Sequence, residues 1–89
     1  MTKNNSYAQG RIGFYEAQLQ NETINQLVEH CNMLASFRGW VGERSYFSHA
    51  LTHELLRRGV DISTVCKDNA IRYIPVCYDS ETHSLIAMS

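Results

Sequence analysis

Apolar residues recur at steps of three and four in the middle of the chain, and this spacing predicts two amphipathic helices. The first covers roughly residues 22–36, and the second runs from Ser45 to the residue before Gly59. Either Asn21 or a capping box of Thr23 with Gln26 can cap the first helix. The apolar stripes are Ile24, Leu27, Val28, Cys31, Leu34 and Ala35 in the first helix, and Phe47, Ala50, Leu51 and Leu55 in the second.

A sharp corner is expected after the second helix. Gly59 is suited to the left-handed position just past a helix end, and Val60 can make the hydrophobic contact that accompanies such a stop. Asp61 can then cap a third, short helix that carries Ile62 and Val65. The middle of the chain is therefore predicted to hold three helices.

The segment from residue 7 to residue 19 fits either a strand or a helix. Ile12 and Phe14 alternate with other residues as in a half-buried strand. Gly10 and Gly13 would each weaken a helix by about 1 kcal/mol relative to alanine. The pattern favours a short strand here.

The last nineteen residues change character and predict a β-hairpin. Ile71–Tyr78 is the first strand, Asp79–His83 the polar turn, and Leu85–Met88 the returning strand. Both faces of this hairpin are apolar, whereas a hairpin on a small domain normally keeps one face in water. The second face is therefore expected to be covered by the N-terminal segment, by another protein or by a second copy of the chain.

Together these elements predict a small α+β fold: an N-terminal strand, three helices and a C-terminal hairpin. Residues 1–6 are expected to be a disordered end, and residues 7–89 a single domain. Of the 89 residues, 44% are hydrophobic and 19% are charged, which is typical of a folded protein. The order of helices followed by a hairpin is also that of winged-helix DNA-binding domains.

The apolar runs and the cysteines of the sequence indicate where the chain is located in the cell and whether its thiols are reduced. No run approaches the roughly 18 apolar residues of a membrane span, and the start of the chain lacks the apolar stretch of a signal peptide. Cys31, Cys66 and Cys77 are odd in number and widely spaced, which indicates reduced thiols. We therefore expect a cytoplasmic chain with no membrane partner.

Catalytic motifs are missing from the sequence, which has no P-loop, GxGxxG or GxSxG. Cys31 lies on an apolar stripe, and its neighbour His30 points about 100° away from it on a helix. A chain this short also has little room for a formed pocket. We expect no enzymatic activity and no cofactor.

Two histidines raise the question of a metal. His49 and His53 are four residues apart on the second predicted helix and share a face, as two metal ligands on one helix do. Nothing else in the spacing demands a metal, and a surface pair explains both residues. We assign no metal site from the sequence and leave open whether this pair binds one.

DNA binding is the second of two functional hypotheses. Residues 38–72 hold six basic and four acidic residues, but the net charge of the whole chain is −1, which argues against a phosphate-binding surface, as does Asp68. In this hypothesis, Ser63, Thr64, Lys67 and Asn69 face bases, and Arg57, Arg58, Arg72 and Arg44 lie near phosphates.

The first hypothesis is a non-catalytic protein-binding module, such as an inhibitor or regulator that occludes its partner's surface. Self-association as a homodimer through the hairpin belongs to the same hypothesis. Tyrosine, tryptophan and arginine dominate the energetics of protein interfaces, and the chain holds these types in its glycine-rich loop and its hairpin. The candidate partner-binding residues are Arg38, Trp40, Arg44, Tyr46, Tyr73, Ile74, Val76 and Tyr78.

Overall fold

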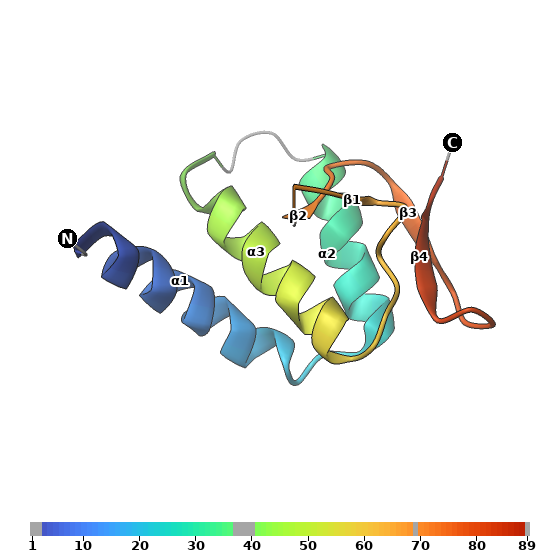
Figure 1. The fold of residues 1–89 in the computed structure, drawn as a ribbon, viewed down its shortest axis with the longest axis horizontal. Coiled ribbons are helices and arrows are strands. Elements are labelled where there is room, and N and C mark those ends of the chain that lie inside the picture. Colours follow the sequence, from blue (N-terminus) through green and yellow to red (C-terminus); the bar gives the residue numbers. More distant parts are fainter. Residues whose placement is uncertain (1–2, 37–40, 69, 89) are drawn as a thin grey trace.

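The computed structural model describes residues 3–36, 41–68 and 70–88. This part of the chain forms three helices followed by two short pairs of antiparallel strands, so the predicted α+β fold with a C-terminal hairpin is confirmed (Figure 1). The elements are α1 (Lys3–Leu19), α2 (Ile24–Ser36), α3 (Val41–Arg57), β1 (Cys66–Lys67), β2 (Ala70–Ile71), β3 (Val76–Asp79) and β4 (Ser84–Ala87).

The N-terminal segment is the helix α1, so the expected strand is wrong. Tyr15 and Leu19 are buried in the core and Ile12 packs against it, and these positions share one face of a helix. Gly10 lies on the exposed side, where an added Cβ would meet nothing within 4 Å. The burial of the 12–15–19 face against α3 therefore outweighs the low helix propensity of the glycines.

Helices α2 and α3 confirm the two predicted amphipathic stripes. α2 begins with the capping box: the amide N of Gln26 donates to Thr23 Oγ1 at 3.1 Å, and that of Thr23 donates to Gln26 Oε1 at 2.8 Å. Asn21 is therefore not the cap. α3 begins at Val41, four residues before the predicted Ser45.

The corner after α3 contains the predicted stop but not the predicted third helix. Gly59 has φ +79, and the amide of Val60 donates to the carbonyl of Leu55 at 3.0 Å, as in a Schellman motif. The backbone of Asp61 then pairs with the hairpin, because its amide donates to His83 O and its carbonyl accepts from the amide of Leu85, both at 2.9 Å. These bonds hold Asp61 in a bridge to β4, and a turn at residues 63–65 stands where the short helix after Asp61 was expected, so that prediction is wrong.

The hairpin is shorter than predicted because the expected first strand is interrupted. Ile71 belongs to β2, which pairs with β1. β3 begins only at Val76, after a bend at Tyr73 and Ile74. β3 and β4 pair from Val76 with Ala87 to Asp79 with Ser84. The side chain of Asn32 on α2 holds the outer edge of β3 by accepting from the amide of Val76 and donating to its carbonyl, at 2.7 and 3.0 Å.

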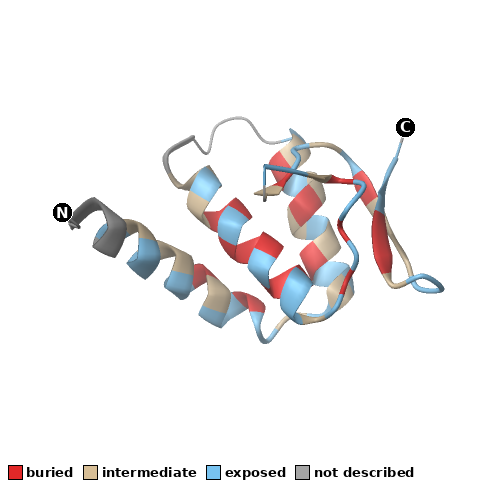
Figure 2. Ribbon diagram, in the orientation of Figure 1, coloured by how far each residue is buried: buried red, intermediate tan, exposed pale blue. Residues whose placement is uncertain are grey.

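The core lies where α3 meets the other elements. α3 runs between α1 and α2, and the hairpin lies on the far side of α2 from α1 (Figure 1). Buried residues line the facing sides of these elements in Figure 2. The largest fully buried side chains are Leu19, Leu27, Leu51, Leu55, Leu85, Val65 and Val76.

Among the described residues, no helix is both long and apolar enough to cross a membrane.

Candidate functional site

The outer face of the hairpin carries four neighbouring apolar side chains, Pro75, Cys77, Ile86 and Met88, which we call the hairpin patch. Side chains alternate across a strand, and Val76 and Leu85 point into the core. Pro75 and Cys77 on either side of Val76, together with Ile86 and Met88, therefore point outward. Cys77 pairs directly with Ile86, and the amide of Met88 donates to the carbonyl of Pro75 at 3.0 Å. Ile86 is 41% exposed and Met88 is 54% exposed, so the patch is open to solvent.

The inner face of the hairpin holds three of the residues expected to bind a partner. Val76 is only 1% exposed and belongs to the core, so its side chain is not accessible to a partner. Ile74 and Tyr78 are half-buried and pack against the same core. The Tyr78 hydroxyl also pairs with Nδ1 of His83, whose Nε2 lies 3.0 Å from the carbonyl oxygen of Arg58. These side chains anchor the hairpin to the end of α3.

The remaining predicted partner residues fall in different places. The Arg44 guanidinium lies 5.0 Å from the centre of the Tyr73 ring, so the structure brings these two together at the base of the hairpin. Tyr46 instead makes an edge contact with Tyr7 of α1, with ring centres 6.0 Å apart. Arg38 and Trp40 lie outside the described residues.

The N-terminal segment packs elsewhere and does not cover the hairpin. α1 contacts α3 along its length, and Figure 1 shows α1 and the β3–β4 pair on opposite sides of the molecule. The sequence allowed three ways to cover the second face of the hairpin, and the packing of α1 excludes the N-terminal segment as one of them. The other two, another protein and a second copy, lie outside the chain itself.

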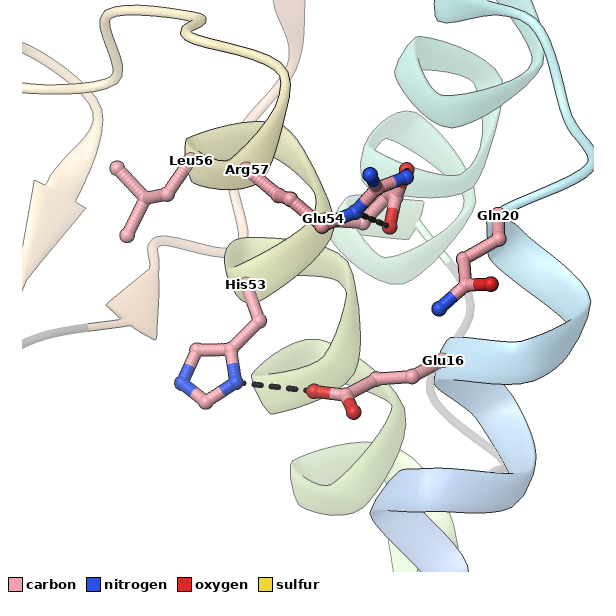
Figure 3. Close-up of a pocket in the computed structure, with 6 residues that line it drawn as sticks. All are labelled: Glu16, Gln20, His53, Glu54, Leu56 and Arg57. Carbon is pink, nitrogen blue, oxygen red and sulfur yellow. Dashed lines mark hydrogen bonds and ion pairs between the residues drawn. The ribbon is translucent and has the colours of Figure 1, made fainter.

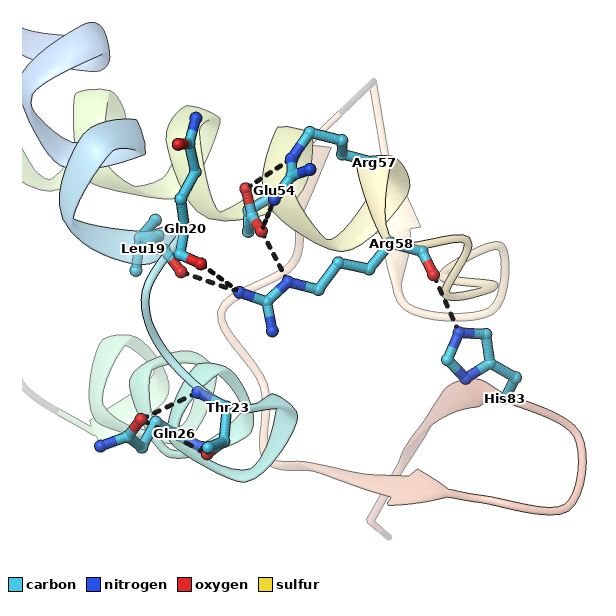
Figure 4. Close-up of polar contacts among 8 residues, drawn as sticks. All are labelled: Leu19, Gln20, Thr23, Gln26, Glu54, Arg57, Arg58 and His83. Atoms are coloured by element: carbon cyan, nitrogen blue, oxygen red, sulfur yellow. Dashed lines mark hydrogen bonds and ion pairs between the residues drawn. The ribbon is translucent and has the colours of Figure 1, made fainter.

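Two of the four arginines assigned to DNA phosphates, Arg57 and Arg58, are paired with a buried carboxylate (Figure 4). Glu54 is 2% exposed and accepts from Arg57 Nη2 and from Arg58 Nε, each at 2.6 Å. Arg58 also donates from Nη2 to the carbonyl of Leu19 at 2.9 Å, which ties the end of α1 to the end of α3. Burial by itself would raise the pKa of Glu54, but the hydrogen bonds from both arginines outweigh it and lower the pKa. Both guanidinium groups are thus paired with Glu54, although Arg57 remains largely exposed.

Of the residues assigned to DNA bases, none of the three that the structure describes lies on a helix. Ser63 and Thr64 are in a turn, and the Thr64 hydroxyl donates to the carbonyl of Leu85 at 3.1 Å. Lys67 is on β1 and Arg72 is exposed just after β2, while Asn69 lies outside the described residues. Without the expected third helix, these side chains form no row that could enter a major groove.

A hollow of about 430 Å³ opens between α1 and α3 (Figure 3). Glu16 on α1 and His53 on α3 meet across it, with 2.9 Å between Glu16 Oε2 and His53 Nδ1. Glu54 and Arg57 line its end and are already paired with each other. The sequence did not identify Glu16, because its role depends on which helices are neighbours. It also missed Glu54, although the spacing of three and four residues to Arg57 and Arg58 was a signal for their pairing.

Cys31, the cysteine next to a histidine in sequence, is a core side chain. It is 1% exposed, and burial raises the pKa of its thiol to about 12. A thiol with this pKa carries almost no thiolate at neutral pH, and thiolate is the nucleophilic form. Neighbouring His30 instead lies 2.6 Å from Glu22 Oε1.

Comparisons with known proteins give no match. No protein-family model, no curated protein and no solved structure resembles the chain at a significant level.

Proposed function

We propose that this chain is a non-catalytic protein-binding module that contacts its partner through the hairpin patch. The observation that carries the proposal is the solvent-facing apolar cluster made by Pro75, Cys77, Ile86 and Met88, with Asp79 next to it on the same face. Apolar patches of this kind on small proteins are typical of contact surfaces. The partner is a second copy of the chain or another protein whose surface the hairpin occludes.

The attachment of the hairpin supports the proposal, because a two-stranded hairpin alone is marginally stable in water. Asn32 holds the outer edge of β3, and Asp61 and Thr64 hold that of β4. Leu85 and Val76 anchor the inner face in the core. A patch fixed in this way binds at a lower cost in conformational entropy than a mobile one does.

The first test is the mass of the protein in solution, measured by light scattering behind a sizing column over a range of concentrations. Ile86→Asp places a charge in the patch without removing a buried side chain, unlike a change at half-buried Ile74. Leu56→Asp on α3 is the matched control, because Leu56 is 54% exposed and lies outside the patch. We expect a dimer that Ile86→Asp dissociates and Leu56→Asp leaves intact, with unchanged circular dichroism in both.

If the wild type is a monomer, the wild type and the two variants are next used as baits for affinity enrichment from cells that express the chain. We then expect a partner that the wild type and Leu56→Asp retain and Ile86→Asp loses. The proposal is wrong if Ile86→Asp changes neither the mass nor the recovered partners. It is also wrong if the monomer co-elutes with random duplex DNA and added salt releases it, which is the behaviour of a phosphate-binding protein.

A further inference from the structure

Two exposed histidines lie side by side on α3, away from the hairpin patch. His49 and His53 are one helical turn apart, and their ring centres are 4.2 Å apart at an angle of 59°. They form one wall of a groove of about 610 Å³, whose other wall is the segment after α3 that includes Asp61, Ser63 and Cys66. The two imidazoles are thus close together and open to solvent.

Glu16 of α1 orients one of the two rings. Its carboxylate oxygen Oε2 lies 2.9 Å from Nδ1 of His53, and Figure 3 shows the carboxylate directed at that nitrogen. In a neutral imidazole, a proton on Nδ1 leaves the lone pair on Nε2. Histidines that ligate metals commonly donate their other ring N–H to a carboxylate in this way, which fixes the ring and increases its basicity.

We propose that His49 and His53 together bind one divalent transition-metal ion, with Glu16 as the positioning residue. Imidazole ligands favour Zn²⁺, Ni²⁺ and Cu²⁺ over Mg²⁺ and Ca²⁺, which prefer oxygen ligands. Two histidines four apart on one helix have the spacing that such a pair of ligands needs. Among the described residues, no group of three or more His, Cys, Asp or Glu could hold a metal, so water completes the coordination.

The other described histidines are engaged differently and supply a control. The Nε2 atom of His30 lies 2.6 Å from Glu22 Oε1, and no second histidine stands one turn from it. His83 uses both ring nitrogens, toward the Tyr78 hydroxyl and the Arg58 carbonyl. His30→Ala therefore removes a histidine that also has a carboxylate neighbour but lacks a paired imidazole.

The test is calorimetric titration of the reduced, metal-free protein with Ni²⁺ and separately with Zn²⁺. We expect one ion per chain, with affinity reduced at least about tenfold by His49→Ala and by His53→Ala and unchanged by His30→Ala. Glu16→Gln should weaken binding by about tenfold and Glu16→Asp by less, because Glu16 acts through His53. In nuclear magnetic resonance spectra, the ring signals of His49 and His53 should shift first on addition of Zn²⁺.

Several results would overturn the proposal. One is the absence of saturable binding at millimolar metal, and another is equal loss of affinity in His30→Ala, which would indicate non-specific binding. Retained binding in the His49 and His53 variants combined with loss in Cys66→Ser would assign the metal to the thiol. Each variant's circular dichroism spectrum separates these outcomes from unfolding, and none depends on the hairpin patch.

Discussion

At the scale of single residues, Glu54 is the centre of a hydrogen-bond network at the end of α3. Its buried carboxylate accepts hydrogen bonds from Arg57 and Arg58, and Arg58 carries the link on to the carbonyl of Leu19. Glu54→Gln keeps the shape but removes the charge that both guanidinium groups face. We expect the free energy of unfolding to fall by about 2 kcal/mol, measured by urea unfolding at neutral pH.

Glu29→Gln is the control for this substitution. Glu29 is exposed on α2, and a surface change away from a charge network shifts stability by about 0.5 kcal/mol or less. If both variants unfold at the same urea concentration, the Glu54 network contributes no more than an ordinary surface charge.

At the scale of elements, the glycines divide into two kinds with opposite expected effects. Gly59 ends α3 with φ +79, and the nearest atom to an added Cβ is 3.9 Å away, so alanine meets no clash there but must adopt a left-handed backbone. Gly59→Ala should destabilise the protein by about 1 kcal/mol. Gly10→Ala and Gly13→Ala fill open space on α1 and should each stabilise it by up to about 1 kcal/mol.

Thermal unfolding of the three alanine variants, followed at the helical signal, checks these signs. Gly10→Ala and Gly13→Ala should raise the melting temperature, and Gly59→Ala should lower it. A destabilising effect of Gly10→Ala or Gly13→Ala would contradict the placement of these two glycines on the exposed face of α1.

At the scale of the whole molecule, ionised carboxylates join α1 to α3. Glu43 Oε1 accepts from the Tyr15 hydroxyl and from Arg11 Nε, both at 2.8 Å, and these bonds lower its pKa. The pKa of Glu54 is also lowered. A carboxyl whose pKa is lower in the folded state stabilises the fold above its unfolded pKa of about 4.3, and this contribution is lost as the pH falls through the folded value.

We therefore expect the urea midpoint to fall steadily between about pH 6 and about pH 3. The double variant Glu43→Gln, Glu54→Gln should start with a lower midpoint and lose less of it over the same range. A wild-type midpoint that stays constant across this range would show that the two carboxyls have the same pKa in both states.

Local patterns in the sequence determined the helices whose apolar stripes are strong. The 24–27–31–34 stripe predicted α2, the Thr23–Gln26 pair supplied its cap, and Gly59 marked the end of α3. The turn at Asp79–His83 likewise predicted the hairpin. These features depend on backbone geometry and on neighbours within a few residues, which one sequence contains.

Tertiary structure alone decided the features that depend on distant partners. α1 is a helix because Tyr15 and Leu19 are buried against α3. The segment after Gly59 forms a bridge and a turn in place of a helix because Asp61 bonds to β4. The alternation of the hairpin predicted two faces, but only the packing of Val76 and Leu85 showed which face points outward. The same reason applies to Glu16, which lies 37 residues before His53 in the sequence: the two side chains meet only because α1 and α3 pack side by side.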